Sequence, residues 1–310
     1  MSARMLDGQA LAATMQQEIV PEVAAFAARH GRPPGLGIVL VGHDPASEVY
    51  VRNKVKTGGE VGFRVDLGRL PESSSLKDVL ALVEHLNRSE AHDGILVQSP
   101  LPKAMGQGAQ QHVFDTISAD KDVDGFGAES VGLLVQNRPK LVACTPAGII
   151  EMLARARIPI AGRHAVVIGR SDIVGKPMAM LLLHRDATVT ICHSRTPDLA
   201  GMAHQADILV AAVGRAGLVT PDFVKPGAVV IDVAINRVTD EAVAASLYPE
   251  GHQRLERFRA KGSMLVGDVH PAVADVASAL TPVPGGVGPL TITMLMHNTL
   301  RAARARVEGR

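Results

Sequence analysis

Near the N-terminus, three side chains suited to proton transfer and aromatic stacking are spaced so that one helical face would carry all three. Asp44 and Pro45 predict the start of a helix, because aspartate is a favoured N-cap and proline suits the first helical turn. Ser47, Tyr50 and Lys54 then fall at i, i+3 and i+7, on one helical face. A lysine partly buried beside an aromatic ring is less stable in its charged form and can act as a base near neutral pH. The same spacing is also typical of an amphipathic surface helix with a half-buried tyrosine.

Two further segments could supply polar partners for this helical face. The segment 94–102 is an apolar strand that ends in Gln98 and runs into a proline-stiffened turn. The segment 120–126 is a compact acidic loop that contains Asp124. Its spacing superficially resembles a calcium loop but lacks the later ligands and the bidentate glutamate, so we expect no metal site. A carboxylate there could instead hold a heterocycle that carries adjacent N–H donors.

A glycine loop in the second half could hold a phosphate. A buried strand is predicted to end at Gly169, and a helix is predicted to begin between Gly175 and Pro177. The N-terminus of such a helix offers free N–H groups and a positive dipole end to an anion. The loop departs from the G-x-G-x-x-G pattern, because Ser171 stands two residues after Gly169. A tight turn without a ligand would have a similar sequence.

The strand after the glycine loop favours NADP over NAD. NAD-binding folds place an acidic residue at the end of this strand for the ribose 2′-hydroxyl. Here Ser194 and Arg195 follow the strand, and Arg170 lies in the glycine loop. Arginine suits a 2′-phosphate, although these arginines could also be simply solvated. Ile235 lies in another strand-end loop, at the sheet edge where ligands of open α/β sheets bind.

Composition narrows the class of protein. The chain has 310 residues, more than one hydrophobic core usually holds, so two domains are expected. Lys and Arg total 32 against 31 acidic residues, and tryptophan is absent, so a nucleic-acid partner is not expected. No apolar run approaches the ~20 residues that span a bilayer, and no targeting segment is evident, so we expect no membrane partner. The two cysteines, Cys144 and Cys192, suit a reduced, cytoplasmic compartment.

Short apolar runs alternate with helical stretches, as in parallel α/β sheets. The predicted strands are 36–41, 64–67, 94–97, 165–168, 188–192, 208–213 and 229–233. The predicted helices include 11–29, 46–61, 76–88 and 290–303. The charged segment 240–261 is predicted to be a solvated surface insertion.

These segments together resemble the bifunctional methylenetetrahydrofolate dehydrogenase/methenyltetrahydrofolate cyclohydrolase (FolD) family. The matching blocks, in the family's order, are 50–54, 94–102, 121–126, 144–148, 169–177, 207–236, 267–269 and 281–289. The resemblance implies a two-domain α/β fold with a cleft between an N-terminal α/β catalytic domain and a Rossmann-type NADP-binding domain. The catalytic domain would comprise residues 1–144 with the C-terminal helix 286–310, and the NADP domain residues 145–285.

The resemblance also implies an activity and a set of site residues. NADP would accept a hydride from 5,10-methylenetetrahydrofolate, and water would open the methenyl product to 10-formyltetrahydrofolate. By position, Lys54 matches the catalytic lysine, Tyr50 the residue that stacks on the folate, Gln98 the glutamine that tunes the lysine, and Asp124 the carboxylate that holds the pterin. The remaining predicted substrate contacts are Ser47, Pro284 and Gly285. The predicted cofactor contacts are Gly169, Arg170, Ser171, Ser194, Arg195 and Ile235. A homodimer is likewise implied.

Several positions depart from the family pattern and leave alternatives open. Ser99 replaces a leucine, Gly127 a histidine and His270 an aspartate. His270 could contact a ligand or could be a satisfied loop histidine. One alternative function is a dehydrogenase with weak or no cyclohydrolase activity. Another is a non-catalytic folate- or nucleotide-binding protein, against which the proton-transfer lysine argues.

Overall fold

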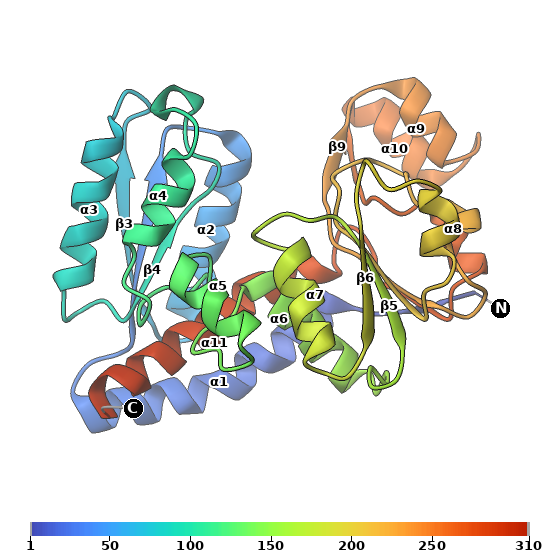
Figure 1. Ribbon diagram of the computed structural model, residues 1–310. Helices are drawn as coiled ribbons and strands as arrows, with labels where there is room; N and C mark the ends of the chain where they lie inside the picture. Colours follow the sequence, from blue (N-terminus) through green and yellow to red (C-terminus); the bar gives the residue numbers. More distant parts are fainter. Residues whose placement is uncertain (1, 309–310) are drawn as a thin grey trace. The chain divides into compact units, whose positions relative to one another are not determined.

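The computed structural model describes residues 2–308, which form two compact units (Figure 1). One unit comprises residues 12–147 and 291–308, and we call it the lysine unit because it contains Lys54. The other comprises residues 2–11 and 148–290, and we call it the glycine-loop unit. The two-domain α/β prediction is therefore confirmed.

The lysine unit is built on a three-stranded parallel sheet of strand order β3-β2-β4. The strands are β2 (Gly35–Val41), β3 (Arg64–Leu70) and β4 (Gly94–Val97). The helices are α1 (Gly8–His30), α2 (Pro45–Glu60), α3 (Leu76–Arg88), α4 (Ala109–Thr116), α5 (Ala128–Val135), α6 (Cys144–Arg155) and α11 (Val287–Glu308), with a short 3-10 turn at Lys103–Met105. The ends of α1 and α11 extend into the other unit, and most of α6 (residues 148–155) belongs to it. Every residue of β2 is buried, as its unbroken apolar sequence predicts for a strand covered on both faces.

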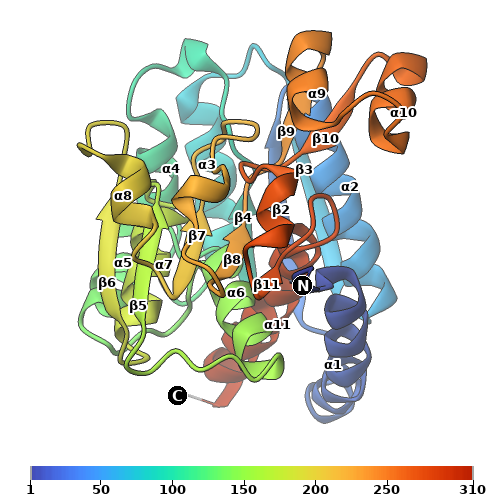
Figure 2. The same ribbon diagram turned by 90° about the vertical axis from the view of Figure 1, so that its right-hand side faces the viewer.

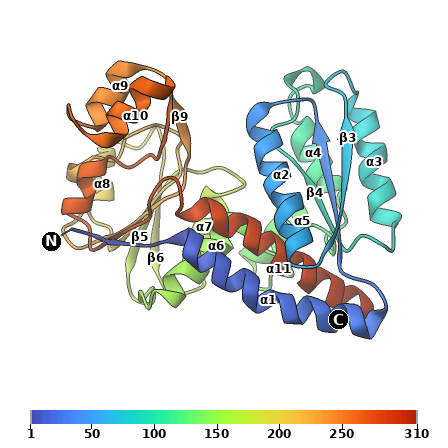
Figure 3. The same ribbon diagram turned by 180° about the vertical axis from the view of Figure 1, so that it is seen from behind.

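Helices on both faces of this sheet form the core of the lysine unit. Helices α2 and α3 lie on opposite faces (Figure 1). Helices α1 and α11 run side by side (Figure 3), where Gln16 Nε2 donates to Thr293 Oγ1 at 3.0 Å and Arg304 pairs with Glu22 at 2.8 Å. A continuous apolar cluster joins α1, α2, α11 and the sheet. The C-terminal helix is therefore part of the core that holds α2 in place.

The glycine-loop unit contains a six-stranded parallel sheet of order β1-β11-β8-β7-β5-β6 (Figure 2). The strands of this sheet are β1 (Arg4–Met5), β5 (His164–Ile168), β6 (Thr188–Cys192), β7 (Ile208–Ala211), β8 (Val229–Asp232) and β11 (Ala279–Leu280). The helices are α7 (Gly175–Leu183) and α8 (Leu199–Ala203), with 3-10 turns at Pro221–Phe223 and Pro271–Asp275. The chain passes from β5 outward to β6 and then back past β5 to β7. Such a reversal is the topological switch point at which open α/β sheets bind ligands.

The charged segment 240–261 is ordered into two helices. Helices α9 (Glu241–Leu247) and α10 (Gln253–Lys261) pack beside a hairpin of β9 (Asn236–Val238) and β10 (Met264–Val266) (Figure 2). Leu247, Tyr248 and Phe258 belong to a small apolar core of their own. The segment is thus more than a solvated insertion, because its charged residues cover an apolar cluster that the composition concealed.

The structure also shows whether any helix could span a membrane and whether any side chains could hold a metal ion. None of the helices within residues 2–308 combines the length and apolar character needed to cross a bilayer. The same residues contain no group of three or more His, Cys, Asp or Glu side chains placed to hold a metal ion.

Candidate active site

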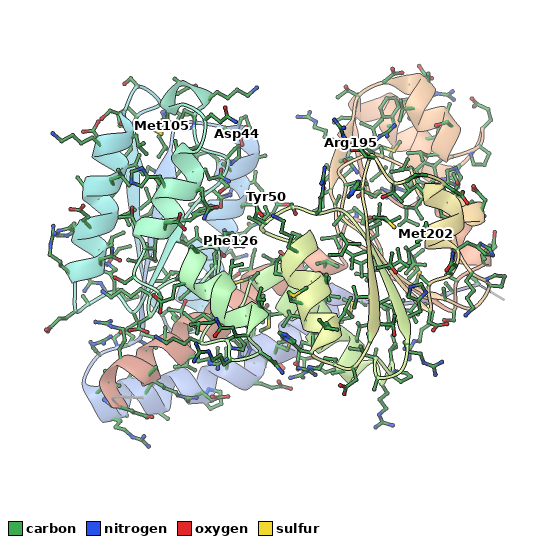
Figure 4. The ribbon with its side chains drawn as sticks, in the orientation of Figure 1. Asp44, Tyr50, Met105, Phe126, Arg195 and Met202 are labelled. Atoms are coloured by element: carbon green, nitrogen blue, oxygen red, sulfur yellow. The ribbon has the colours of Figure 1, made fainter. Side chains whose placement is uncertain are left out.

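Helix α2 presents Ser47 and Lys54 on its buried face. The Asp44 carboxylate accepts a hydrogen bond from the Ser47 backbone N–H at 2.8 Å, and Pro45 is the first helical residue. The predicted helix start is therefore confirmed (Figure 4). Ser47 is 4% exposed and Lys54 8%, whereas Tyr50 is 39% exposed, with its ring available to a flat ligand. Partial burial raises the pKa of the Tyr50 hydroxyl.

Lys54 reaches the strand that the sequence singled out. Its Nζ donates to Gln98 Oε1 at 3.0 Å. The Gln98 amide nitrogen donates to the Ser99 carbonyl at 2.8 Å, which orients the amide so that its oxygen faces the lysine. The Gln98 backbone N–H donates to Val39 O at 2.9 Å and ties this end of β4 to the sheet. The Lys54 amine is therefore held by an uncharged acceptor, the Gln98 amide, whose backbone is hydrogen-bonded to the sheet.

Asp124 completes the cluster in the lysine unit. The carboxyl group is close enough to the Lys54 amine for an electrostatic attraction. Burial raises the pKa of Asp124, and the positive charge of Lys54 partly offsets that increase. The structure thus brings together Lys54 from α2, Gln98 from the end of β4 and Asp124 from the loop between α4 and α5.

The loop that carries Asp124 is shaped by a neighbouring aspartate that the sequence analysis did not single out. The buried Asp122 carboxylate accepts hydrogen bonds from the backbone N–H groups of Gly125, Phe126 and Gly127 and from the Ser130 hydroxyl. A Cβ on Gly127 would lie 3.1 Å from Asp122 Oδ2, so the glycine at this departure from the family pattern has a packing reason.

Two more residues anchor the same loop. Lys121 Nζ donates to the carbonyl oxygens of Leu86, Asn87 and Ser89, at the end of α3. Asn298, on α11, donates at 2.8 Å to the carbonyl oxygens of both Val123 and Val142. Asn298 stands in an apolar helix, where a buried amide needs partners, and it also matches the family pattern, but the sequence did not show which groups it would bind. The part of the loop just before Asp124 is therefore anchored to α3 through Lys121 and to α11 through Asn298.

The glycine-loop unit holds the predicted cofactor residues. Gly169 follows β5 with φ +130°, and a Cβ there would lie 2.3 Å from Ala212 O. Gly175, at the start of α7, lies close against Gly169, since its Cβ would be 2.4 Å from Gly169 O. Only glycine fits at either position, and the loop backbone is left close to the sheet edge.

The start of α7 differs from the expectation of free N–H groups. Ser171 Oγ accepts hydrogen bonds from the N–H groups of Val174 and Gly175, both at 3.2 Å. The Lys176 N–H donates to the Ser171 carbonyl at 3.0 Å. Ser171 therefore accepts hydrogen bonds from donors at the start of α7, and these three N–H groups already have partners in the protein. A phosphate would have to use other donors, of which the Arg170 side chain is one.

The remaining predicted cofactor residues are exposed. Arg195 lies just past the end of β6 (Figure 4), and it is exposed together with Ser194 and Arg170. Within residues 2–308 neither arginine forms an ion pair, so both charges are available to an anion. Ile235 is 39% exposed in the segment between β8 and β9.

Pro284 and Gly285 lie in the glycine-loop unit, in the segment between β11 and α11. Gly285 has φ +104° and its carbonyl accepts a hydrogen bond from the Gln9 N–H at 3.0 Å. His270 acts as a satisfied loop residue, because Nδ1 accepts from the Ala272 N–H and Nε2 lies 3.1 Å from Ser246 O.

The fold and these clusters define the class of protein: a two-unit α/β chain with a Rossmann-type sheet in one unit and a buried lysine–amide pair in the other. Two family models match the chain. The tetrahydrofolate dehydrogenase/cyclohydrolase catalytic-domain model matches residues 6–124, and the model of the NAD(P)-binding domain of the same family matches residues 143–307. The chain therefore belongs to the tetrahydrofolate dehydrogenase/cyclohydrolase family, as the sequence blocks predicted.

Individual relatives agree with this assignment. The chain is 54% identical to the bifunctional protein FolD of Koribacter versatilis over 306 residues, covering 99% of this chain and 98% of that protein. A solved structure of the Trypanosoma brucei methylenetetrahydrofolate dehydrogenase-cyclohydrolase, complexed with NADP cofactor and inhibitor, has a TM-score of 0.88 at 38% identity and 99% coverage of both chains. The bifunctional enzyme FolD from Campylobacter jejuni has a TM-score of 0.86 at 37% identity, covering 98% of this chain and 100% of that one.

Proposed function

We propose that this protein oxidises 5,10-methylenetetrahydrofolate with NADP and then hydrolyses the methenyl product to 10-formyltetrahydrofolate. The observation that carries the proposal is the 3.0 Å hydrogen bond from Lys54 Nζ to Gln98 Oε1 on the buried face of α2. Family membership and the names of the similar proteins support the substrate, and the NADP-bound Trypanosoma brucei relative supports the cofactor.

The dehydrogenase step requires mainly that the substrate be aligned with the cofactor. Loss of a hydride from the one-carbon bridge leaves an amidinium-like cation that the two folate nitrogens stabilise, so correct placement of the substrate supplies much of the rate. Bound NADP would supply the hydride acceptor. Arg170 and Arg195 fit its 2′-phosphate, because both are exposed cations without an ion-pair partner among the described residues. Gly169 would allow its pyrophosphate to approach the backbone.

The hydrolytic step asks for proton transfer. Water adds to the bridge carbon and loses a proton, the bond from that carbon to the ring nitrogen N5 breaks, and N5 takes up a proton. The second proton of the water goes to solvent. Lys54 is the group we assign to these transfers, with Gln98 fixing its position. Tyr50 would stack on the pterin, Asp124 would accept its N–H donors, and Ser47, Pro284 and Gly285 would complete the substrate contacts.

Two assays run in parallel test the function. One follows NADPH formation from methylenetetrahydrofolate, and the other follows decay of the methenyl absorbance. The proposal predicts both activities in the purified chain. NADPH formation with accumulation of the methenyl compound would instead indicate a dehydrogenase with little cyclohydrolase activity. Folate binding without turnover would indicate a non-catalytic binding protein.

We further propose a division of labour, a compartment and an oligomeric state. Residues 1–144 with 286–310 would bind folate, and residues 145–285 would bind NADP. Both cysteines are free and buried, which suits the reducing cytoplasm. For a homodimer, support comes from β6, which pairs only with β5 among the described strands and leaves Ile191 39% exposed. Light scattering would test this, with Ile191→Lys expected to give monomers if β6 forms the interface.

A further inference from the structure

Asp268 lies fully buried in the glycine-loop unit, just past the end of β10, and its carboxylate gathers four hydrogen-bond donors. Oδ2 accepts from the backbone N–H groups of Val213 at 2.7 Å and Gly214 at 3.1 Å. Oδ1 accepts from the Arg215 N–H at 2.7 Å and from Asn236 Nδ2 at 3.0 Å. A carboxylate has about four lone-pair sites, so this group has no remaining capacity to bind a ligand itself.

A second carboxylate holds the backbone of Asp268 in place. Asp232, at the end of β8, accepts hydrogen bonds from the N–H groups of Asp268 at 2.8 Å and Val269 at 3.0 Å. A Cβ on Gly267 would lie 1.7 Å from Asp232 Oδ2, so this approach requires glycine. The Thr281 hydroxyl in turn accepts from the Asp232 N–H at 2.7 Å. These hydrogen bonds hold the backbone of Asp268 against the end of β8, so the position of its carboxylate is set by the sheet.

The groups that Asp268 holds lie where a dinucleotide is expected. Val213, Gly214 and Arg215 follow β7, and Asn236 comes directly after the predicted cofactor residue Ile235. Both segments leave the carboxyl ends of adjacent strands, the edge at which open α/β sheets bind ligands. Gly214 has φ +72°, a conformation that favours glycine and turns three successive N–H groups inward to one carboxylate.

We infer that Asp268 is a positioning residue for NADP binding. It fixes the 213–215 loop and Asn236 in the conformation that receives the cofactor, and Asp268 itself does not contact the cofactor. The inference rests on the proposed use of NADP. Without the carboxylate, the three N–H groups would turn toward solvent or toward the cofactor, and the loop would lose its fixed form. The cost would appear in cofactor binding, because Asp268 and the loop belong to a different unit from Lys54 and Gln98.

The test is the isosteric variant Asp268→Asn. Its amide keeps one acceptor oxygen but turns an NH2 group toward two of the four donors. We expect the dissociation constant and the KM for NADP to rise about tenfold or more, as for loss of a charged hydrogen-bond acceptor. We expect kcat and the KM for methylenetetrahydrofolate to stay within about twofold. The matched control is Asp240→Asn, an exposed aspartate whose side chain accepts the Ala242 N–H and which should behave as wild type.

A second variant keeps the inference testable if Asp268→Asn does not fold. Asn236→Ala removes one of the four donors and leaves the carboxylate intact, so a smaller rise in the NADP dissociation constant, about threefold, is expected. Unchanged NADP binding in whichever variant folds would overturn the inference. Equal losses in kcat, folate binding and NADP binding would also overturn it, by showing a general structural role. If the wild-type protein itself does not bind NADP, the proposed function fails instead.

Discussion

At the scale of single residues, the buried hydroxyl of Ser99, next to the lysine–amide pair, leads to a prediction about the stability of the fold. Its Oγ is buried and has no hydrogen-bond partner within residues 2–308. A buried unpaired hydroxyl costs about 1–3 kcal/mol, so Ser99→Ala should raise the free energy of unfolding by about 1 kcal/mol. Urea unfolding would measure the change, with the exposed Ser118→Ala as the control. Equal or lower stability of Ser99→Ala would show that the hydroxyl is already satisfied.

The residues that bear chemistry were partly readable from the sequence. Helical spacing placed Ser47 and Lys54 on one buried face, and the polar end of an apolar strand indicated Gln98. The residues that shape the loops around both clusters were not found. Asp122 and Asp268 hold backbone N–H groups, and nothing in a local sequence shows which N–H groups a carboxylate will meet. Their roles depend on loop geometry that exists only once the strands have assembled.

At the scale of elements, we propose that the loops after β5 and β6 determine the preference for NADP over NAD. Arg195→Ala should weaken NADP binding roughly 10–100-fold, the range expected for a charge-assisted contact to the 2′-phosphate. NAD lacks that phosphate, so its binding should hardly change. Titration of both nucleotides against wild type and variant measures this, and Arg185→Ala, an exposed arginine in the turn before β6, is the control. An equal loss for the two nucleotides would refute the assignment of Arg195 to the 2′-phosphate.

The same scale shows why some elements escaped sequence-based prediction. Seven predicted strands and the main helices are confirmed to within a few residues, because apolar runs and capping residues are local signals. Strands β1 and β11 have only two residues each, and Arg4 pairs with Ala279 from the far end of the chain. No local pattern encodes such a pairing. Likewise, the apolar residues of α9 and α10 are sparse among charges, so their common core became apparent only in three dimensions.

At the scale of the whole molecule, the two buried carboxyl groups of Asp232 and Asp268 should make the stability of the fold depend on pH. Burial and the charge of Asp268 raise the pKa of Asp232 from 3.8 to about 7. Between about pH 4 and pH 7 the folded state keeps a proton that the unfolded chain releases. The free energy of unfolding contributed by this group therefore falls as pH rises through that window, by roughly 1.4 kcal/mol per pKa unit.

The variant Asp232→Asn isolates this contribution, because its amide does not titrate. Denaturant unfolding of wild type and variant at about pH 5 and about pH 8 measures the difference in slope. We expect wild type to lose stability relative to the variant as pH rises. A constant difference across the range would show that Asp232 ionises in the folded protein as it does in the unfolded chain.

The most direct test of the central claim compares Lys54→Met with Lys56→Met in the methenyl hydrolysis assay. Lys56 lies on the same helix with its side chain 71% exposed, so its loss should leave hydrolysis unchanged. Lys54→Met removes the amine that we assign to proton transfer, and we expect hydrolysis to slow roughly 100-fold or more while folate still binds. Near-normal hydrolysis in Lys54→Met would contradict the account.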